Sequence, residues 1–125
     1  MLQLSLNRPG EHLFVRAASA EAITVVDRVL TRSFLLAADR AQEAWPVRDP
    51  TQLDAAAIDD VLAFRPEVVI LGTGTRAVFP PPAVQAQFLQ RGIGLETMDN
   101  AAAARTFNVL VSEGRRAVAA FILPG

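Results

Sequence analysis

The first half of the chain carries short apolar runs that are typical of β-strands. Leu2, Leu4 and Leu6 alternate with polar residues, and the turn-forming residues 7–10 follow them. Further β-prone runs with polar breaks between them are residues 13–16, 23–26 and 33–37. The pattern predicts several short strands ahead of the first helix.

A proline-containing stretch then interrupts this pattern. Pro46 and Pro50 indicate a loop, because proline lacks a backbone N–H and is excluded from most element interiors. Trp45 precedes this loop. We expect its ring to close the edge of the core; the alternative is a ring that stacks on a ligand.

From residue 51 the apolar spacing becomes helical. Thr51 and Asp54 are similar to a capping box, and Arg65 with Pro66 ends the run. The apolar residues at helical spacing are Leu53, Ala57, Val61 and Phe64. The continuous apolar residues 68–71 then predict a strand that is covered on both faces.

Two more helices alternate with strands in the second half. Pro81 and Pro82 are suited to begin a helix that stops at Gly92, with Val84, Phe88 and Leu89 on its apolar face. Residues 93–95 predict a strand. Asp99 or Asn100 caps the next helix, which ends at Gly114. The residues expected on its inner face are Ala103, Phe107, Leu110 and Val111. Residues 116–123 predict the closing strand. Strands followed by β-α-β-α-β indicate one α/β domain over residues 1–125 with a mixed sheet.

The amino-acid composition excludes several kinds of chemistry. The chain has 125 residues, a net charge of −1, no cysteine and no lysine, and His12 is its single histidine. Thiol catalysis, disulfides and histidine-rich metal sites are therefore excluded, and we expect no metal and no cofactor. The near-zero charge argues against nucleic-acid binding. No apolar run is long enough to span a bilayer and no signal peptide is apparent, so we expect a cytoplasmic protein.

The segment Gly72-Thr73-Gly74-Thr75-Arg76-Ala77 fits the dinucleotide-binding pattern G-x-G-x-x-A after a buried strand. Glu96 lies 24 positions beyond Gly72, near where such folds hold a ribose. However, residues 80–82 are prolines, which separate the glycines from the next helix and offer it no N–H groups. A phosphate loop of the Walker type also needs a lysine. We therefore expect a tight strand exit and no nucleotide.

Polar residues gather at one predicted edge of the sheet. A right-handed crossover between the strands at 68–71 and 93–95 places the loops 72–82 and 96–100 side by side. Ala101, Arg105, Asn108 and Ser112 form a polar stripe on the helix that follows. This stripe is either structural, with Arg105 paired to Glu96 or Asp99 and Asn108 holding a loop, or it binds something.

The C-terminal run resembles an uncharacterised domain family, domain of unknown function 498, that includes the mitochondrial NADH:ubiquinone oxidoreductase complex assembly factor 3. That family has a strand ending in G-T-G, an acidic residue, M-D-T, A-A, R-T-Y-N-x-L and E-x-R-R. The matches are Gly72-Thr73-Gly74, Glu96, Met98-Asp99, Ala102-Ala103, Arg105-Thr106, Asn108, Leu110, Glu113 and Arg115-Arg116. Asn100 replaces the family's threonine and Phe107 its tyrosine, so no mechanism based on a tyrosine hydroxyl applies.

The resemblance implies a three-layer α/β fold with mixed sheets and no established catalytic activity. The complex assembly role is not carried over, because it depends on mitochondrial partners. We expect a non-catalytic domain that binds a protein partner or a small ligand at the edge formed by residues 72–82 and the helix from Asn100. The alternative is an enzyme or nucleotide-binding protein using Glu96, Asp99, Arg105 and Asn108 in a pocket. The candidate binding residues are Gly72, Thr73, Gly74, Thr75, Glu96, Asp99, Arg105 and Asn108.

Overall fold

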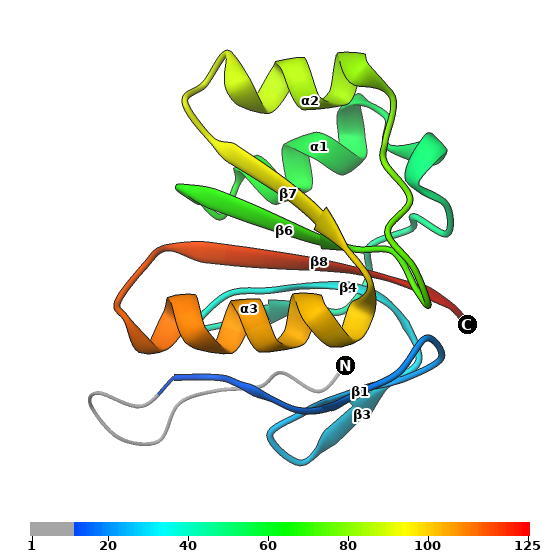
Figure 1. The fold of residues 1–125 in the computed structure, drawn as a ribbon, viewed down its shortest axis with the longest axis vertical. Coiled ribbons are helices and arrows are strands. Elements are labelled where there is room, and N and C mark those ends of the chain that lie inside the picture. The colour runs from blue at the N-terminus through cyan, green and yellow to red at the C-terminus, as the bar shows by residue number, and fades with distance from the viewer. Residues whose placement is uncertain (1–11) are drawn as a thin grey trace.

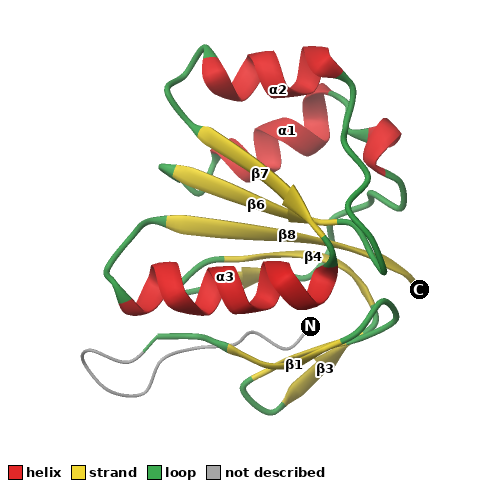
Figure 2. Ribbon diagram, in the orientation of Figure 1, coloured by secondary structure: helices red, strands yellow, loops and turns green. Residues whose placement is uncertain are grey.

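The chain folds into three layers around a five-stranded sheet (Figure 1). A computed structural model describes residues 12–125, so the strand and turn expected at residues 2–10 lie outside the described part. Helices α1 (Ala55–Leu62) and α2 (Pro82–Leu89) cover one face of the sheet. Helix α3 (Asn100–Ser112) and a three-stranded sheet together cover the other face (Figure 2). The α/β class and the layers agree with the sequence analysis.

The five-stranded sheet is mixed, as the sequence predicts. Its order is β5-β4-β8-β6-β7, and the strands are β4 (Arg32–Leu36), β5 (Ala41–Gln42), β6 (Val68–Gly72), β7 (Gly94–Met98) and β8 (Ala117–Pro124). Strand β6 pairs in parallel with both β7 and β8, whereas β4 pairs antiparallel with β8 and β5. The last strand of the chain therefore occupies the centre of the sheet.

The small sheet is an antiparallel meander of β1 (Val15–Ala18), β2 (Ile23–Val25) and β3 (Arg28–Leu30). The sequence pattern does not predict β3. Two residues, Val26 and Asp27, connect β2 to β3, and Val26 takes a φ of 56°. Such turns normally carry glycine or asparagine where φ is positive, so this hairpin lacks the usual turn signal.

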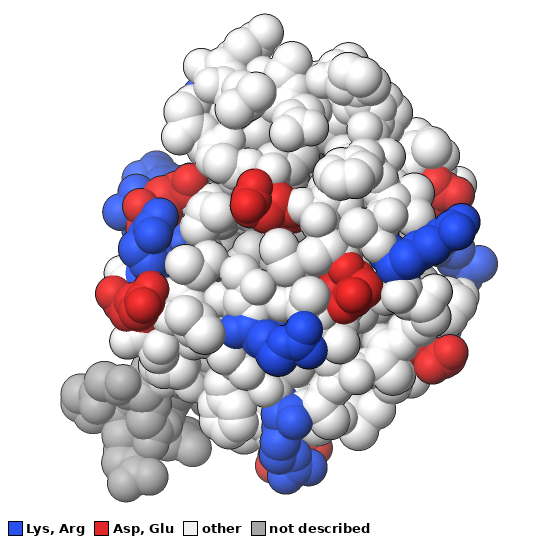
Figure 3. All heavy atoms as spheres, in the orientation of Figure 1, with Lys and Arg blue, Asp and Glu red and all other residues white. Residues whose placement is uncertain are grey.

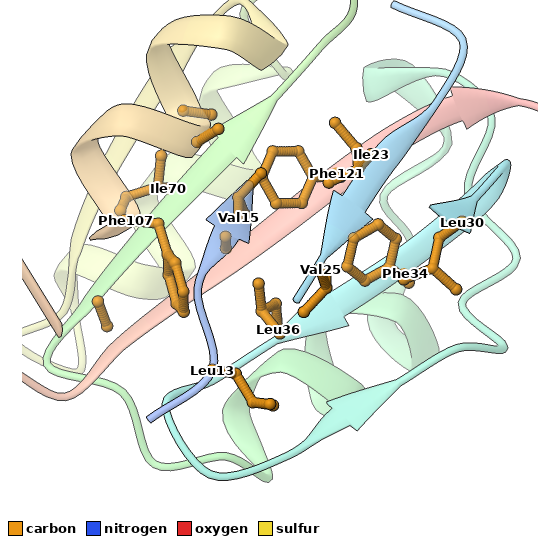
Figure 4. Packing of buried hydrophobic residues seen from close by; sticks show 14 of the residues in the cluster. Leu13, Val15, Ile23, Val25, Leu30, Phe34, Leu36, Ile70, Phe107 and Phe121 are labelled. Atoms are coloured by element: carbon orange, nitrogen blue, oxygen red, sulfur yellow. The ribbon is translucent and has the colours of Figure 1, made fainter. Parts of the chain in front are cut away.

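Alternate residues of the central strands face two separate cores. Along β8, Ala119 and Phe121 face α3 and the small sheet, while Val118 and Ala120 face α1 and α2. The rings of Phe34 and Phe121 stack with centroids 5.3 Å apart in the first core (Figure 4). Burial on both faces explains why residues 68–71 and 117–123 are continuously apolar.

Helix α1 begins later than the sequence analysis placed it, and the proposed capping box at Thr51 is wrong. Residues Pro50–Gln52 form a short 3₁₀ turn, in which the Thr51 amide and hydroxyl both donate to Asp49, at 2.8 and 2.7 Å. Asp54 itself is the N-cap of α1 and accepts the Ala57 N–H at 2.9 Å. A short aspartate thus caps each of two successive turns.

Two expectations about apolar side chains had different outcomes. Trp45 is buried and its ring N–H donates to the Ala57 carbonyl at 3.1 Å, so it closes the edge of the core as expected. The sequence pattern puts Leu89 on the inner face of α2, but the residue is 62 % exposed. Because α2 has two turns, Val84 and Phe88 alone, one turn apart, reach the core.

Glu67 connects the beginning of β6 to the beginning of β8. Its carboxylate accepts the Arg116 backbone N–H at 2.9 Å and the Arg115 side chain at 3.0 Å. Its own N–H donates to the Arg116 carbonyl at 2.9 Å. The bond from Arg116, followed by that from Arg115, lowers the pKa of Glu67. The pair Arg115-Arg116 therefore has a structural role at the start of the central strand.

We predict that Glu67→Gln reduces thermal stability at neutral pH and that this difference disappears in acid. A lowered folded-state pKa means that the Glu67 carboxylate stabilises the folded protein above its ordinary pKa of about 4.3, and that this stabilisation is lost as the pH falls through the lowered value. Melting curves of both proteins between neutral and acidic pH measure the difference. A difference that grows as the pH falls would contradict the assignment.

Candidate functional site

Asn100 lies at the centre of the predicted edge and is completely buried. Its side-chain carbonyl accepts the Gly74 N–H at 3.1 Å. Its amide group donates to the carbonyls of Ser19 at 3.2 Å and Ile122 at 3.5 Å. One side chain therefore joins the glycine loop, the turn after β1 and the central strand β8.

The sequence pattern does not reveal this role and suggests Asn100 only as an alternative helix cap. In the structure Asp99 is the N-cap, with its carboxylate 2.7 Å from the Ala102 N–H, and Asn100 is the first residue of α3. The sequence feature that could have indicated this buried role is the asparagine directly after a capping aspartate. A second short polar residue there is free to point away from the helix and into the protein.

Gly72 ends β6 directly beneath Asn100, and this closeness explains the glycine. A Cβ atom at position 72 would lie 2.6 Å from the Asn100 Oδ1, 3.0 Å from the Phe121 ring and 3.2 Å from the Ala103 Cβ. The Asn100 oxygen cannot retreat without losing its bond to Gly74. The first glycine of the motif therefore permits close packing of α3 against β6.

Thr73 holds the loop in shape through its backbone and its hydroxyl. Its N–H donates to the Met98 carbonyl at 3.0 Å, which extends the β6–β7 pairing. Its hydroxyl donates to the Arg76 carbonyl at 2.6 Å and accepts the Val78 N–H at 2.9 Å. The exit from β6 is thus a braced turn.

The structure brings the two loops together, as the predicted crossover requires. The Asn100 N–H donates to the Gly74 carbonyl at 2.8 Å, and Gly74 has a φ of 105°, which favours glycine. The N–H groups of Thr73 and Gly74 are therefore both bonded within the protein. Helix α2 begins well beyond the loop at Pro82, after the N-cap residue Pro81. The motif lacks the helix N-terminus that a dinucleotide phosphate would contact.

Asn108 has a structural role in the polar stripe of α3. Its side-chain carbonyl accepts the Val15 N–H and its amide donates to the Val15 carbonyl, both at 2.8 Å. The side chain thereby imitates a neighbouring strand for β1. The sequence pattern suggests that Asn108 holds a loop, whereas in the structure it holds strand β1.

Arg105 and Glu96 differ from this pattern because both side chains are exposed. Among residues 12–125, no salt bridge joins Arg105 to Glu96 or Asp99, so the expected pairing of Arg105 is wrong. Thr75 is exposed at the tip of the glycine loop. These three side chains are available to solvent, whereas Asp99 and Asn108 are bonded within the fold.

The hollows found in the described part of the chain lie elsewhere or are shallow. The larger ones, about 450 and 520 Å³, are lined by residues around Arg40 and Arg116 and around Trp45 and Arg48. An open hollow of about 230 Å³ contacts Arg105 on α3, together with Thr106, Val109 and Leu110. None of these hollows gathers Glu96, Asp99, Arg105 and Asn108. Within residues 12–125 no cluster of ligating side chains fits a metal ion, and no helix is long and apolar enough to cross a membrane.

Charged side chains are scattered over the face drawn in Figure 3, and the region over α2 carries almost none. The sequence agrees, since residues 77–90 contain no ionisable side chain. Phe79 lies in this segment and is 69 % exposed. Pro81 and Pro82 beside it are also exposed. An uncharged surface with an exposed aromatic ring therefore adjoins the glycine loop.

Comparison with known proteins places this fold in a family. The family model described as "Protein of unknown function (DUF498/DUF598)" matches residues 15–122. The chain belongs to this family. The resemblance drawn from Gly72-Thr73-Gly74 and the C-terminal motifs is thereby confirmed.

Proteins with solved structures share the fold. An NMR structure of a Xanthomonas campestris protein is 48 % identical, with a TM-score of 0.85, over 98 % of this chain and 92 % of that one. A Bordetella pertussis protein described as a Mth938-like domain is 27 % identical, with a TM-score of 0.77, over 98 % and 92 %. The NADH dehydrogenase [ubiquinone] 1 alpha subcomplex assembly factor 3 of Xenopus tropicalis is 38 % identical over 58 % of this chain and 39 % of its own length. The chain matches less than two thirds of the length of its curated relatives.

We predict that Gly72→Ala destabilises the protein while Gly94→Ala does not. The new methyl group at position 72 must displace Asn100 or Phe121, and such overpacking costs about 1–3 kcal/mol. The nearest atom to a Cβ at position 94 is the Val68 Cγ2 at 3.7 Å, an ordinary contact. Urea unfolding of the two variants makes the comparison. Equal stabilities would show that the close approach at Gly72 is relaxed in solution.

Asn100→Ala should lower stability, whereas Arg105→Ala on the same helix should not. The first change leaves the Gly74 N–H and the carbonyls of Ser19 and Ile122 without their partner. The Ile122 carbonyl is buried, and a buried unsatisfied group costs about 1–3 kcal/mol. Arg105 is exposed, and its removal is expected to change the free energy of unfolding by less than about 0.5 kcal/mol. Thermal melts of both variants test this. A large loss in Arg105→Ala would mean that Arg105 has a structural partner in solution.

Proposed function

We propose that this chain is a non-catalytic domain that binds a protein partner at the edge formed by residues 72–82 and the start of α3. The observation that carries the proposal is the exposed ring of Phe79 beside the braced glycine loop. A large aromatic side chain that is exposed in the free protein gains much from burial against a partner. Phe79 is therefore assigned as the main contact.

The backbone holds Phe79 in position before any partner arrives. On one side the Val78 N–H is bonded to the Thr73 hydroxyl, and on the other side Pro80 is buried. Pro81 and Pro82 then restrict the backbone further. Little conformational entropy is lost when such a ring is buried, which favours binding.

The surroundings of Phe79 suit the centre of a protein interface. Residues 77–90 carry no charge, so their burial has no ionic desolvation penalty. Charged residues are also depleted at the centres of known interfaces. Arg105, Glu96 and Thr75 are exposed polar residues from the same predicted edge and supply contacts at the rim.

The relatives support a protein as the partner. The Xenopus tropicalis relative is an assembly factor by name, and a protein that assists assembly acts on other proteins. A small ligand is less well supported, because the hollow that contacts Arg105 is open and shallow.

Phe79→Ala should weaken partner binding by about 30-fold or more, the size expected for a central aromatic contact. The test is affinity capture from the native cell with the wild-type protein and Phe79→Ala, followed by quantitative mass spectrometry and titration of the recovered protein. The fold should be unchanged, because Phe79 is exposed.

Val29→Ala is the matched control. Val29 is 60 % exposed on β3 of the small sheet, so this change also removes an exposed apolar side chain but does so in the other sheet. Recovery of the same partners at the same affinity by wild type and Phe79→Ala would contradict the proposed function. So would recovery of metabolites without any protein.

A further inference from the structure

The five-stranded sheet ends at β7, and no described strand lies beyond it (Figure 2). The Gly94 N–H donates to the Glu67 carbonyl and the Met98 carbonyl accepts the Thr73 N–H, so both residues face β6. Backbone groups alternate along a strand that is paired on one side, and therefore Leu95 and Thr97 direct their N–H and C=O groups away from the sheet. Two donors and two acceptors are thus presented at an open edge.

An open strand edge is a template for a further strand. We propose that the partner adds an extended segment to β7 and that this segment carries a basic side chain opposite Glu96. This inference rests on the proposed function, in which the partner is a protein. The segment bonds Leu95 and Thr97 through its own backbone. Side chains on the sheet face then decide which segments fit.

Glu96 supplies the charge preference. It lies between Leu95 and Thr97, its side chain is exposed, and no salt bridge holds it among residues 12–125. Its side chain projects on the same face of the sheet as that of Met98, two residues along. Met98 faces α3, because the Thr106 hydroxyl donates to its sulfur at 3.4 Å. Opposite charges across a strand pair are favourable, so a lysine or arginine is preferred opposite Glu96.

The same carboxylate disfavours a second copy of this chain. Two antiparallel β7 strands use all four outward groups only when Leu95 of one copy is opposite Thr97 of the other. That register places the two Glu96 side chains directly opposite each other. Like charges in this position are destabilising, so Glu96 protects the edge from self-pairing.

The first test uses amide exchange and peptide titration monitored by NMR. In the free protein the amides of Leu95 and Thr97 should exchange at least about tenfold faster than those of Glu96 and Met98. The probe is the acetylated and amidated peptide Thr-Val-Lys-Val-Thr, and the matched control replaces its lysine with glutamate. The lysine peptide should bind about threefold or more tightly than the control and slow the exchange of Leu95 and Thr97.

Two variants examine the geometry and the charge separately. Thr97→Pro removes an outward N–H and leaves the bonds to β6 intact, a change that edge strands tolerate, and it should abolish peptide binding. Glu96→Arg keeps the strand and should reverse the preference, so that the glutamate peptide binds more tightly. Circular dichroism confirms that each variant is folded, and Glu96→Arg alone suffices if Thr97→Pro does not fold.

The outcomes separate this inference from the proposed function. Equal binding of both peptides, no binding at millimolar concentration, or protected Leu95 and Thr97 amides in the free monomer would overturn strand addition. A dimer that Thr97→Pro dissociates would overturn it as well, because a second copy would then occupy the edge. If Phe79→Ala loses the cellular partner while Thr97→Pro keeps it, the proposed function stands and strand addition fails. If the peptides behave as expected while no partner depends on Phe79, strand addition stands and the assignment of Phe79 as the main contact fails.

Discussion

The hydrogen bonds of the buried Asn100 side chain hold together the edge of the sheet formed by the glycine loop and the start of α3. Its bonds to Gly74, Ser19 and Ile122 fix a loop, a turn and the central strand relative to α3. Buried polar groups are costly when unpaired and stabilising when paired, so this residue permits one arrangement of the four segments. The glycine at position 72 exists to make room for it.

In this arrangement the glycine motif has a structural role and is not a phosphate-binding loop. Elsewhere G-x-G loops leave their N–H groups free for phosphate, but here Met98 and Asn100 already accept those of Thr73 and Gly74. The loop is therefore a rigid support, and Phe79 is the exposed group that it supports. The proposed binding surface consists of apolar side chains and open backbone beside the loop, which a search for charged or nucleophilic residues does not reveal.

The sequence predicts the helices and the buried strands because the spacing of their apolar residues depends on whether an element packs against one core or against two. It failed where local chemistry decided the result: Val26 forms a hairpin turn without a turn-forming residue, and two aspartates rather than a capping box begin the turns near Thr51. At the candidate site, spacing correctly placed the two loops together. The separate roles of Asn108 and Arg105 could not be predicted, since both are polar residues on one stripe and only the position of β1 distinguishes them.

The central position of β8 has a consequence for how the protein is made. Strand β8 pairs with both β4 and β6, so neither strand has its inner partner until residues 117–124 have left the ribosome. Until then the nascent chain exposes two unpaired edges and the apolar faces of both future cores. The five-stranded sheet therefore cannot close before β8 has been synthesised, and a ribosome that stalls before Ala117 holds a chain that cannot complete either core.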